Sequence, residues 1–200
     1  MLAALGAECR LVRVPADLDG LDGLVMPGGE STTMSLGIAR EGLAEPLREL
    51  AAAGTPVLGT CAGMIMLDRD HLGVMDTRAE RNAFGRQVRS FEADLDLPGV
   101  DGPPMRAVFI RARRNAFGRQ VRSFEADLDF DGLDGGPLRA VFIRAPWIEE
   151  HGGDVTILAE LDGHPVAARQ GAMLAVAFHP ELAGDPRVHQ QLLTLIRDRA

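Results

Sequence analysis

A pentapeptide near the middle of the first half contains the residue best suited to covalent chemistry. Gly59–Gly63 (GTCAG) follows an apolar run and precedes a helical pattern, which is the arrangement of a nucleophile elbow with cysteine as the nucleophile. Flanking glycines let neighbouring backbone pass close to such a tight turn. A free cysteine is more often a small buried apolar residue, but this setting favours Cys61 as a nucleophile, with the Ala62 amide placed to hold an oxyanion.

A histidine and a glutamate two residues apart form the second candidate element. His179-Pro180-Glu181 follows an apolar run, and Pro180 biases the residue before it toward extended backbone. Residues two apart on extended backbone face the same side, so Glu181 is expected to orient His179 as the base for Cys61. A strand-end histidine beside a solvated glutamate is the alternative. The other histidines are expected at the surface or in loops: His71, His151, His164 and His189.

A glycine pair at the end of another short apolar run is the third element. Gly28 and Gly29 permit a peptide orientation that other residues resist, and the Gly29 amide could complete an oxyanion hole with Ala62. Glu30 offers a negative charge to a substrate ammonium group. A structural turn before a capped helix explains the same residues, so this element is weak alone.

The predicted secondary structure places these residues at the ends of strands. Short apolar runs alternate with helical patterns in the first third, which indicates an α/β fold with a mostly parallel sheet. We expect strands at 9–14, 24–26, 56–59, 155–161, 166–169 and 174–178, and helices at 31–40, 43–53, 62–68 and 187–199.

The middle of the chain contains an internal repeat. Residues 81–113 (copy 1) and 114–146 (copy 2) are identical at 27 of 33 positions, including the first 16. Solenoid repeats diverge more and usually need three or more units to bury a core, so this pair indicates either a recent tandem duplication or an artefact of sequence assembly, inside one domain spanning 1–200. One copy is expected in the native position, and the other to loop out, pair elsewhere or swap.

Composition excludes several classes of function. A formal net charge of −8 argues against nucleic acid or an anionic membrane as partner, because both bind surplus positive charge. No apolar run reaches the length of a membrane span, and no basic leader opens the chain. Two cysteines without a Cys/His cluster indicate free thiols, no metal and a reducing cytoplasm.

Five segments together resemble the class I glutamine amidotransferases, and within them the glutaminase subunits of pyridoxal 5'-phosphate synthase. GTCAG and FHPE occur in many amidotransferases, whereas PGGESTTM, RNAFGRQ and VFIRAP are typical of this subfamily. The segments are Pro27–Met34 (PGGESTTM), Gly59–Ile65 (GTCAGMI), Arg81–Asp94 and again Arg114–Asp127 (RNAFGRQVRSFEAD), Ala140–Pro146 (AVFIRAP) and Ala177–Leu182 (AFHPEL).

The resemblance implies a role for each matching residue. Cys61 would be the nucleophile, His179 the base and Glu181 its partner, with the Gly29 and Ala62 amides at the oxyanion. An arginine of RNAFGRQ, either Arg81 or Arg114, would contact glutamine, and the two stay open. Ile143 and Arg144 are favoured over the same pair in copy 1, because only copy 2 continues into Ala-Pro. The remaining implied glutamine contacts are Gly28, Gly29 and Glu30.

The resemblance also implies the fold and the reaction. It predicts a three-layer, flavodoxin-like sandwich that normally opens with a strand before the position of Met1, so this chain would lack that strand. It predicts hydrolysis of L-glutamine without metal or organic cofactor, with ammonia passed to a barrel-shaped synthase subunit. Two alternatives remain: a cysteine hydrolase with another class of substrate, and a catalytically impaired subunit that only docks.

Overall fold

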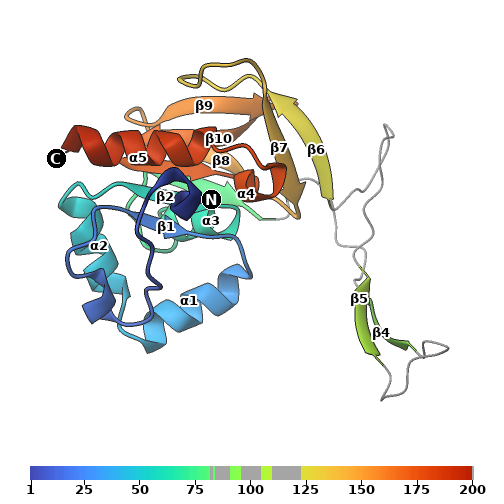
Figure 1. The fold of residues 1–200 in the computed structure, drawn as a ribbon, viewed down its shortest axis with the longest axis horizontal. Coiled ribbons are helices and arrows are strands. Elements are labelled where there is room, and N and C mark those ends of the chain that lie inside the picture. The colour runs from blue at the N-terminus through green and yellow to red at the C-terminus, as the bar shows by residue number, and fades with distance from the viewer. Residues whose placement is uncertain (82, 84–90, 96–104, 110–122, 200) are drawn as a thin grey trace.

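A five-stranded sheet forms the centre of the protein (Figure 1). The computed structural model describes residues 1–81, 83, 91–95, 105–109 and 123–199. The strand order is β1-β2-β11-β10-β9. β1, β2 and β11 are parallel, whereas β10 and β9 are antiparallel to their neighbours. Their bounds are β1 Leu24–Met26, β2 Val57–Thr60, β11 Met173–Val176, β10 His164–Gln170 and β9 Thr156–Leu161.

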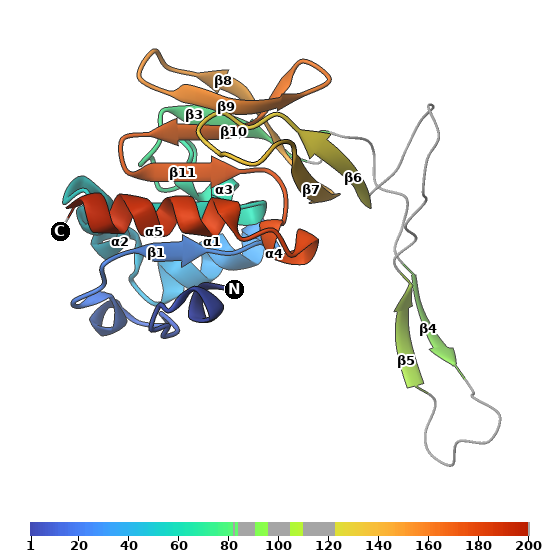
Figure 2. The ribbon, with the colours of Figure 1, turned by 45° about the horizontal axis from the view of Figure 1, so that its top comes forward.

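Helices cover both faces of this sheet, as Figure 2 shows. β2 (VLGT) and β11 (MLAV) are buried at every position, so neither alternates apolar and polar residues as a strand with one solvated face does. α5 lies on one face, and α1, α2 and α3 lie on the other. The predicted three-layer α/β sandwich is therefore confirmed. The helices are α1 Ser31–Arg40, α2 Ala44–Ala52, α3 Ala62–Leu67, α4 Pro180–Ala183 and α5 Arg187–Arg199, with 3-10 turns at Leu2–Leu5 and Pro15–Leu18.

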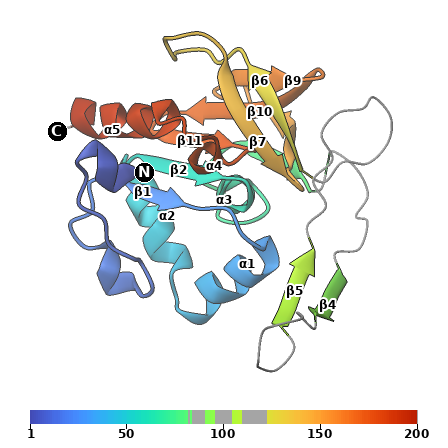
Figure 3. The ribbon, with the colours of Figure 1, turned by 45° about the vertical axis from the view of Figure 1, so that its right-hand side comes forward.

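Three antiparallel pairs complete the structure. β3 (Thr77–Glu80) pairs with β8 (Trp147–His151). β4 (Phe91–Leu95) and β5 (Met105–Phe109) form the hairpin of copy 1, and β6 (Ser123–Leu128) and β7 (Leu138–Ile143) form that of copy 2. The copy 2 hairpin contributes buried residues to the hydrophobic core, namely Leu128, Leu138, Ala140 and Phe142, and Figure 3 shows it beside β9 and β10.

Two of the expectations about elements are wrong. Residues 9–14 form no strand, and Leu11 and Val14 are exposed. A strand needs a neighbour for its backbone hydrogen bonds, and β1 pairs only with β2 among the described strands. The chain after His179 is not extended either, because Pro180 begins α4, and proline at the first helical position is favourable.

The histidines are also less uniform than expected. His189 is buried on α5, with 6% of its surface exposed, because it lies on the face of α5 that packs on the sheet with Val188 and Leu192. His71 is half-buried and hydrogen-bonded to Asp68. The apolar periodicity of residues 187–199 contains the signal for the burial of His189, whereas the position of His71 depends on a turn.

Candidate active site

Cys61 lies in a strained turn between β2 and α3. Its backbone has φ 49° and ψ −106°, a conformation that L-residues rarely adopt and that persists only where the surroundings enforce it. A Cβ atom on Gly59 would lie 2.6 Å from the Gly63 carbonyl oxygen, and one on Gly63 would lie 1.8 Å from that of Met26. The elbow therefore requires both glycines, as the sequence predicts. Ala62 is the first residue of α3, so its amide has no acceptor within the helix.

His179 and Glu181 come from the segment that follows β11. The His179 amide donates to the Val141 carbonyl of β7 at 2.8 Å, and its ring Nδ1 lies 2.9 Å from Glu181 Oε1. A Cβ atom on Gly28 would lie 2.3 Å from His179 Cε1, so Gly28 makes room for the imidazole. The expected hydrogen bond is present, although it joins a helix cap to the first turn of α4 instead of two residues of a strand.

The charges of the pair support one another. The neighbouring Cys61 side chain, and then the hydrogen bond with Glu181, raise the pKa of His179 to about 9 against the opposing effect of burial. Burial acts to raise the pKa of Glu181, but the His179 hydrogen bond, a backbone amide and nearby positive charge together hold that pKa below its ordinary value. The imidazolium is thus the favoured form at neutral pH and is ready to give a proton to a leaving group.

A cavity of about 280 Å³ lies over the cysteine. The cavity brings together most of the residues predicted from the sequence. Gly28 and Glu181 are not among its lining residues, and both lie against the imidazole of His179. Arg114 lies outside the described residues. The lining residues are Gly29, Glu30, Ser31, Cys61, Ala62, Ile65, Arg81, Ile143, Arg144, Pro146 and His179.

Glu30 has a structural task in addition to its place in the cavity. Its carboxylate caps α1 by accepting from the Thr32 and Thr33 amides at 3.1 and 2.7 Å, and from the Thr33 hydroxyl at 2.7 Å. The hydroxyl and the two amides lower the pKa of Glu30 to about 2. The Glu30 carboxylate therefore stays charged at neutral pH.

The two copies of the repeat each supply part of the cavity wall. Arg81 belongs to copy 1, and Ile143 and Arg144 belong to copy 2. The Ala83 amide donates to the Ala145 carbonyl at 3.2 Å, so the start of copy 1 lies beside the end of copy 2. Arg144 has φ 47°, a rare conformation at a second residue of this cavity.

Sequence reasoning missed two residues next to the cavity. His71 Nδ1 lies 2.7 Å from Asp68 Oδ1, and its Nε2 lies 2.8 Å from Arg81 Nη2. The signal was an Asp and a His three residues apart just after the nucleophile helix, a spacing too common to be informative alone. In the described part of the chain, no group of three or more metal-ligating side chains is present, and no helix is long and apolar enough to cross a membrane.

Comparison with known proteins gives a consistent answer. The SNO glutamine amidotransferase family matches residues 1–113 and 112–197, two parts that meet where the copies join. The pyridoxal 5'-phosphate synthase subunit PdxT of Mycobacteroides abscessus is 50% identical over 201 residues, covering 96% of this chain and 86% of the relative. PdxT of Geobacillus kaustophilus is 45% identical, with 98% and 87% covered.

Comparison with solved structures gives the same family and fold. A crystal structure of a glutamine amidotransferase superposes with a TM-score of 0.76 at 37% identity, covering 98% of this chain and 89% of the other. The crystal structure of a GMP synthase subunit from Thermoplasma acidophilum, with a TM-score of 0.53 at 16% identity, covers 92% of this chain and 77% of the other and shares the fold.

Proposed function

Because this chain belongs to the SNO glutamine amidotransferase family, we propose that it hydrolyses the side-chain amide of L-glutamine to L-glutamate and ammonia with Cys61 as nucleophile. The observation that carries the proposal is that Cys61 and His179 line one cavity and Glu181 hydrogen-bonds the His179 ring, although 117 residues lie between the cysteine and the histidine in the sequence. An elbow cysteine, a base and an orienting carboxylate are the parts that acyl transfer needs.

The first half-reaction releases ammonia. The Cys61 thiolate attacks the amide carbon of glutamine, and a C–S bond forms while the carbonyl oxygen takes the negative charge. The Ala62 and Gly29 amides stabilise this oxyanion. As the tetrahedral intermediate collapses, the His179 imidazolium gives its proton to the departing nitrogen, the C–N bond breaks, and ammonia leaves a glutamyl thioester on Cys61.

The second half-reaction restores the enzyme. Neutral His179 takes a proton from water, which attacks the thioester carbon. The C–S bond breaks, the new carboxylic acid releases its proton to solvent, and glutamate and the Cys61 thiolate remain beside the imidazolium. The sum is one water consumed and one amide hydrolysed. Glu181 keeps the imidazole of His179 oriented through both steps, because its Oε1 lies 2.9 Å from the ring Nδ1.

The charges around the cavity suit the rest of the glutamine molecule. Glu30 is the group proposed for the α-ammonium, and Arg81 and Arg144 are proposed for the α-carboxylate. Since the PdxT relatives are subunits of pyridoxal 5'-phosphate synthase, we propose that the ammonia passes to a synthase subunit in the cytoplasm. No step of this glutaminase reaction requires a metal or an organic cofactor.

Matched cysteine variants test the proposal. Glutamate release is measured with the synthase subunit present, for the parent chain and for Cys61→Ala, His179→Ala and Cys9→Ala. Cys9 is exposed and free, whereas Cys61 is buried, so Cys9→Ala controls for the loss of a thiol. We expect Cys61→Ala and His179→Ala to lose roughly a thousandfold or more in kcat, and Cys9→Ala to match the parent. Turnover that survives Cys61→Ala would refute the proposed chemistry.

A further inference from the structure

Arg81, the first residue of copy 1, lines the cavity. Its side chain is hydrogen-bonded to His71, which is not one of the lining residues. Arg81 is exposed and lines the cavity mouth. An unrestrained arginine loses considerable rotamer freedom when it binds a ligand. Here its Nη2 already lies 2.8 Å from His71 Nε2, so part of that freedom is lost before glutamine arrives.

His71 is itself held in place by the turn that follows the nucleophile helix. Its Nδ1 lies 2.7 Å from Asp68 Oδ1, and its amide donates to the Asp68 carbonyl at 3.3 Å. The Asp68 side chain is 1% exposed. Its two carboxylate oxygens also accept the amides of Asp70 and Ala79, at 3.0 and 3.2 Å. Asp68 is therefore a fixed acceptor, and the ring of His71 has a fixed orientation.

The hydrogen-bond partners define the state of the imidazole. A carboxylate that accepts two amides acts as an acceptor toward His71 as well, so the proton is on Nδ1. A guanidinium can only donate, so Nε2 carries the lone pair. The bound histidine is neutral and presents an acceptor to Arg81, which is the tautomer control that a carboxylate gives to a histidine elsewhere in proteins.

We propose that Asp68 and His71 are positioning residues that hold the Arg81 guanidinium at the mouth of the cavity, ready for the α-carboxylate of glutamine. The proposal rests on the proposed function. Asp68 directly follows α3, whose first residue follows Cys61. The same helix therefore carries the nucleophile at one end and the support for the carboxylate-binding arginine at the other, which sets the distance between them.

Loss of the His71 imidazole should weaken the binding of glutamine without changing the rate of the chemical step. Arg81 contacts a part of glutamine remote from the amide, so an unsupported guanidinium weakens ground-state and transition-state binding together. For His71→Phe we expect KM for glutamine to rise roughly tenfold, the size of one lost hydrogen bond to a charged group, and kcat to stay within about twofold. His71→Gln, which keeps an acceptor, should recover part of the affinity.

A double-mutant cycle separates positioning from folding. His71→Phe, Arg81→Ala and the double variant are compared in the complex with the synthase subunit. His151→Phe is the control, because His151 is exposed and its ring bonds the carbonyl of the next residue, Gly152. If His71 acts through Arg81, His71→Phe has no further effect on KM once Arg81 is alanine. Additive effects, or an unchanged KM in His71→Phe, overturn the inference.

Calorimetry gives a readout that does not depend on turnover. Glutamine is titrated into Cys61→Ala, with and without His71→Phe, and Kd should rise roughly tenfold with the second change. A parent chain that binds glutamine but shows no turnover dependent on Cys61 contradicts the proposed function and leaves this inference testable by Kd. Equal Kd values in the two variants contradict the inference and leave the proposed function intact.

Discussion

Copy 1 and copy 2 have nearly the same sequence and different places in the molecule. Their hairpins pair in the same register, with Phe91 opposite Phe109 in one and Phe124 opposite Phe142 in the other. The copy 2 hairpin packs on the core, where Phe142 is fully buried and its ring centroid lies 5.6 Å from that of Phe178. β4 and β5 form a sheet with each other alone among the described strands. The paired strand residues of the two hairpins differ only at Met105 and Leu138, so the strands alone distinguish the hairpins little.

The turns between the strands differ in residues that affect which hairpin can pack on the core. Gly136 has φ 83°, and the equivalent residue of copy 1 is Pro103; a proline ring restricts φ to about −65°. The Asp131 amide donates to the Leu158 carbonyl of β9 at 2.8 Å, and its equivalent, Pro98, has no amide hydrogen. The copy 1 turn cannot adopt the conformation of the copy 2 turn in this place.

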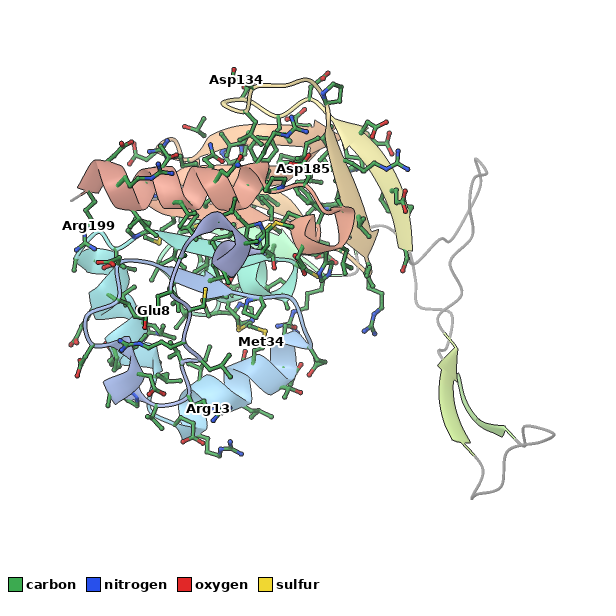
Figure 4. All side chains as sticks on the ribbon, viewed as in Figure 1. Glu8, Arg13, Met34, Asp134, Asp185 and Arg199 are labelled. Atoms are coloured by element: carbon green, nitrogen blue, oxygen red, sulfur yellow. The ribbon has the colours of Figure 1, made fainter. Side chains whose placement is uncertain are left out.

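An arginine outside the repeat reinforces the same turn. Arg187, at the start of α5, donates to the carbonyls of Asp134, Gly136 and Pro137 at 3.1, 2.6 and 2.9 Å, and pairs with Asp185 at 2.7 Å. Figure 4 labels Asp134 in this turn and Asp185 just before α5. A few backbone groups at this turn therefore distinguish two hairpins whose strands are nearly identical.

The largest effect is expected from giving copy 2 the turn of copy 1. Asp131→Pro with Gly136→Pro removes one backbone hydrogen bond and imposes a forbidden φ, which together cost about 4 kcal/mol in the free energy of unfolding. Urea titration measures the loss. The reciprocal changes, Pro98→Asp with Pro103→Gly, should have little effect alone and should recover part of the loss when combined with the first pair. An unchanged urea midpoint in the first variant would show that the turns do not determine which hairpin packs on the core.

Matched phenylalanines test the comparison in the strands. Phe142→Ala should lower the free energy of unfolding by about 3 kcal/mol, since it empties a fully buried site between Phe124 and Phe178. Phe109→Ala makes the same change at the equivalent position of copy 1 and should cost much less, because β5 pairs only with β4 among the described strands. Thermal unfolding of both variants provides the measurement, and equal losses would mean that both hairpins support the core.

The arginine at the turn should contribute less than the buried phenylalanine. Arg187→Ala removes the donor for three carbonyls, and we expect a loss of about 2 kcal/mol in the free energy of unfolding. Arg197→Ala is the control, because Arg197 is an exposed residue of α5 that bonds within its own helix. Urea titration of both variants should separate them; similar losses would mean that Arg187 stabilises α5 rather than the turn.

The sequence predicted the local geometry of the candidate site better than that of its surroundings. The elbow at Cys61 was predictable because its two glycines are required by backbone contacts within a few residues, and the bounds of 31–40 and 187–199 were predicted correctly because their signals are local. The failures depend on distant partners. Residues 9–14 alternate like a strand but have no neighbouring strand among those described, and the support of Arg81 by His71 depends on how the turn after α3 places the ring.

Removing copy 1 should have the smallest effect on the free energy of unfolding, and it tests directly whether copy 1 is needed. Deletion of residues 82–114 joins Arg81 to Asn115 and leaves a single repeat whose first 16 residues are unchanged, because the copies are identical there. The connection from Arg81 to β6 then shrinks from residues 82–122 to 115–122, and the shorter loop should stabilise the protein by about 1 kcal/mol. The described cavity keeps its arginines at Arg81 and Arg144, so KM for glutamine should match that of the parent chain. A deletion variant that is less stable, or that binds glutamine less well, would mean that the copy 1 hairpin supports the fold.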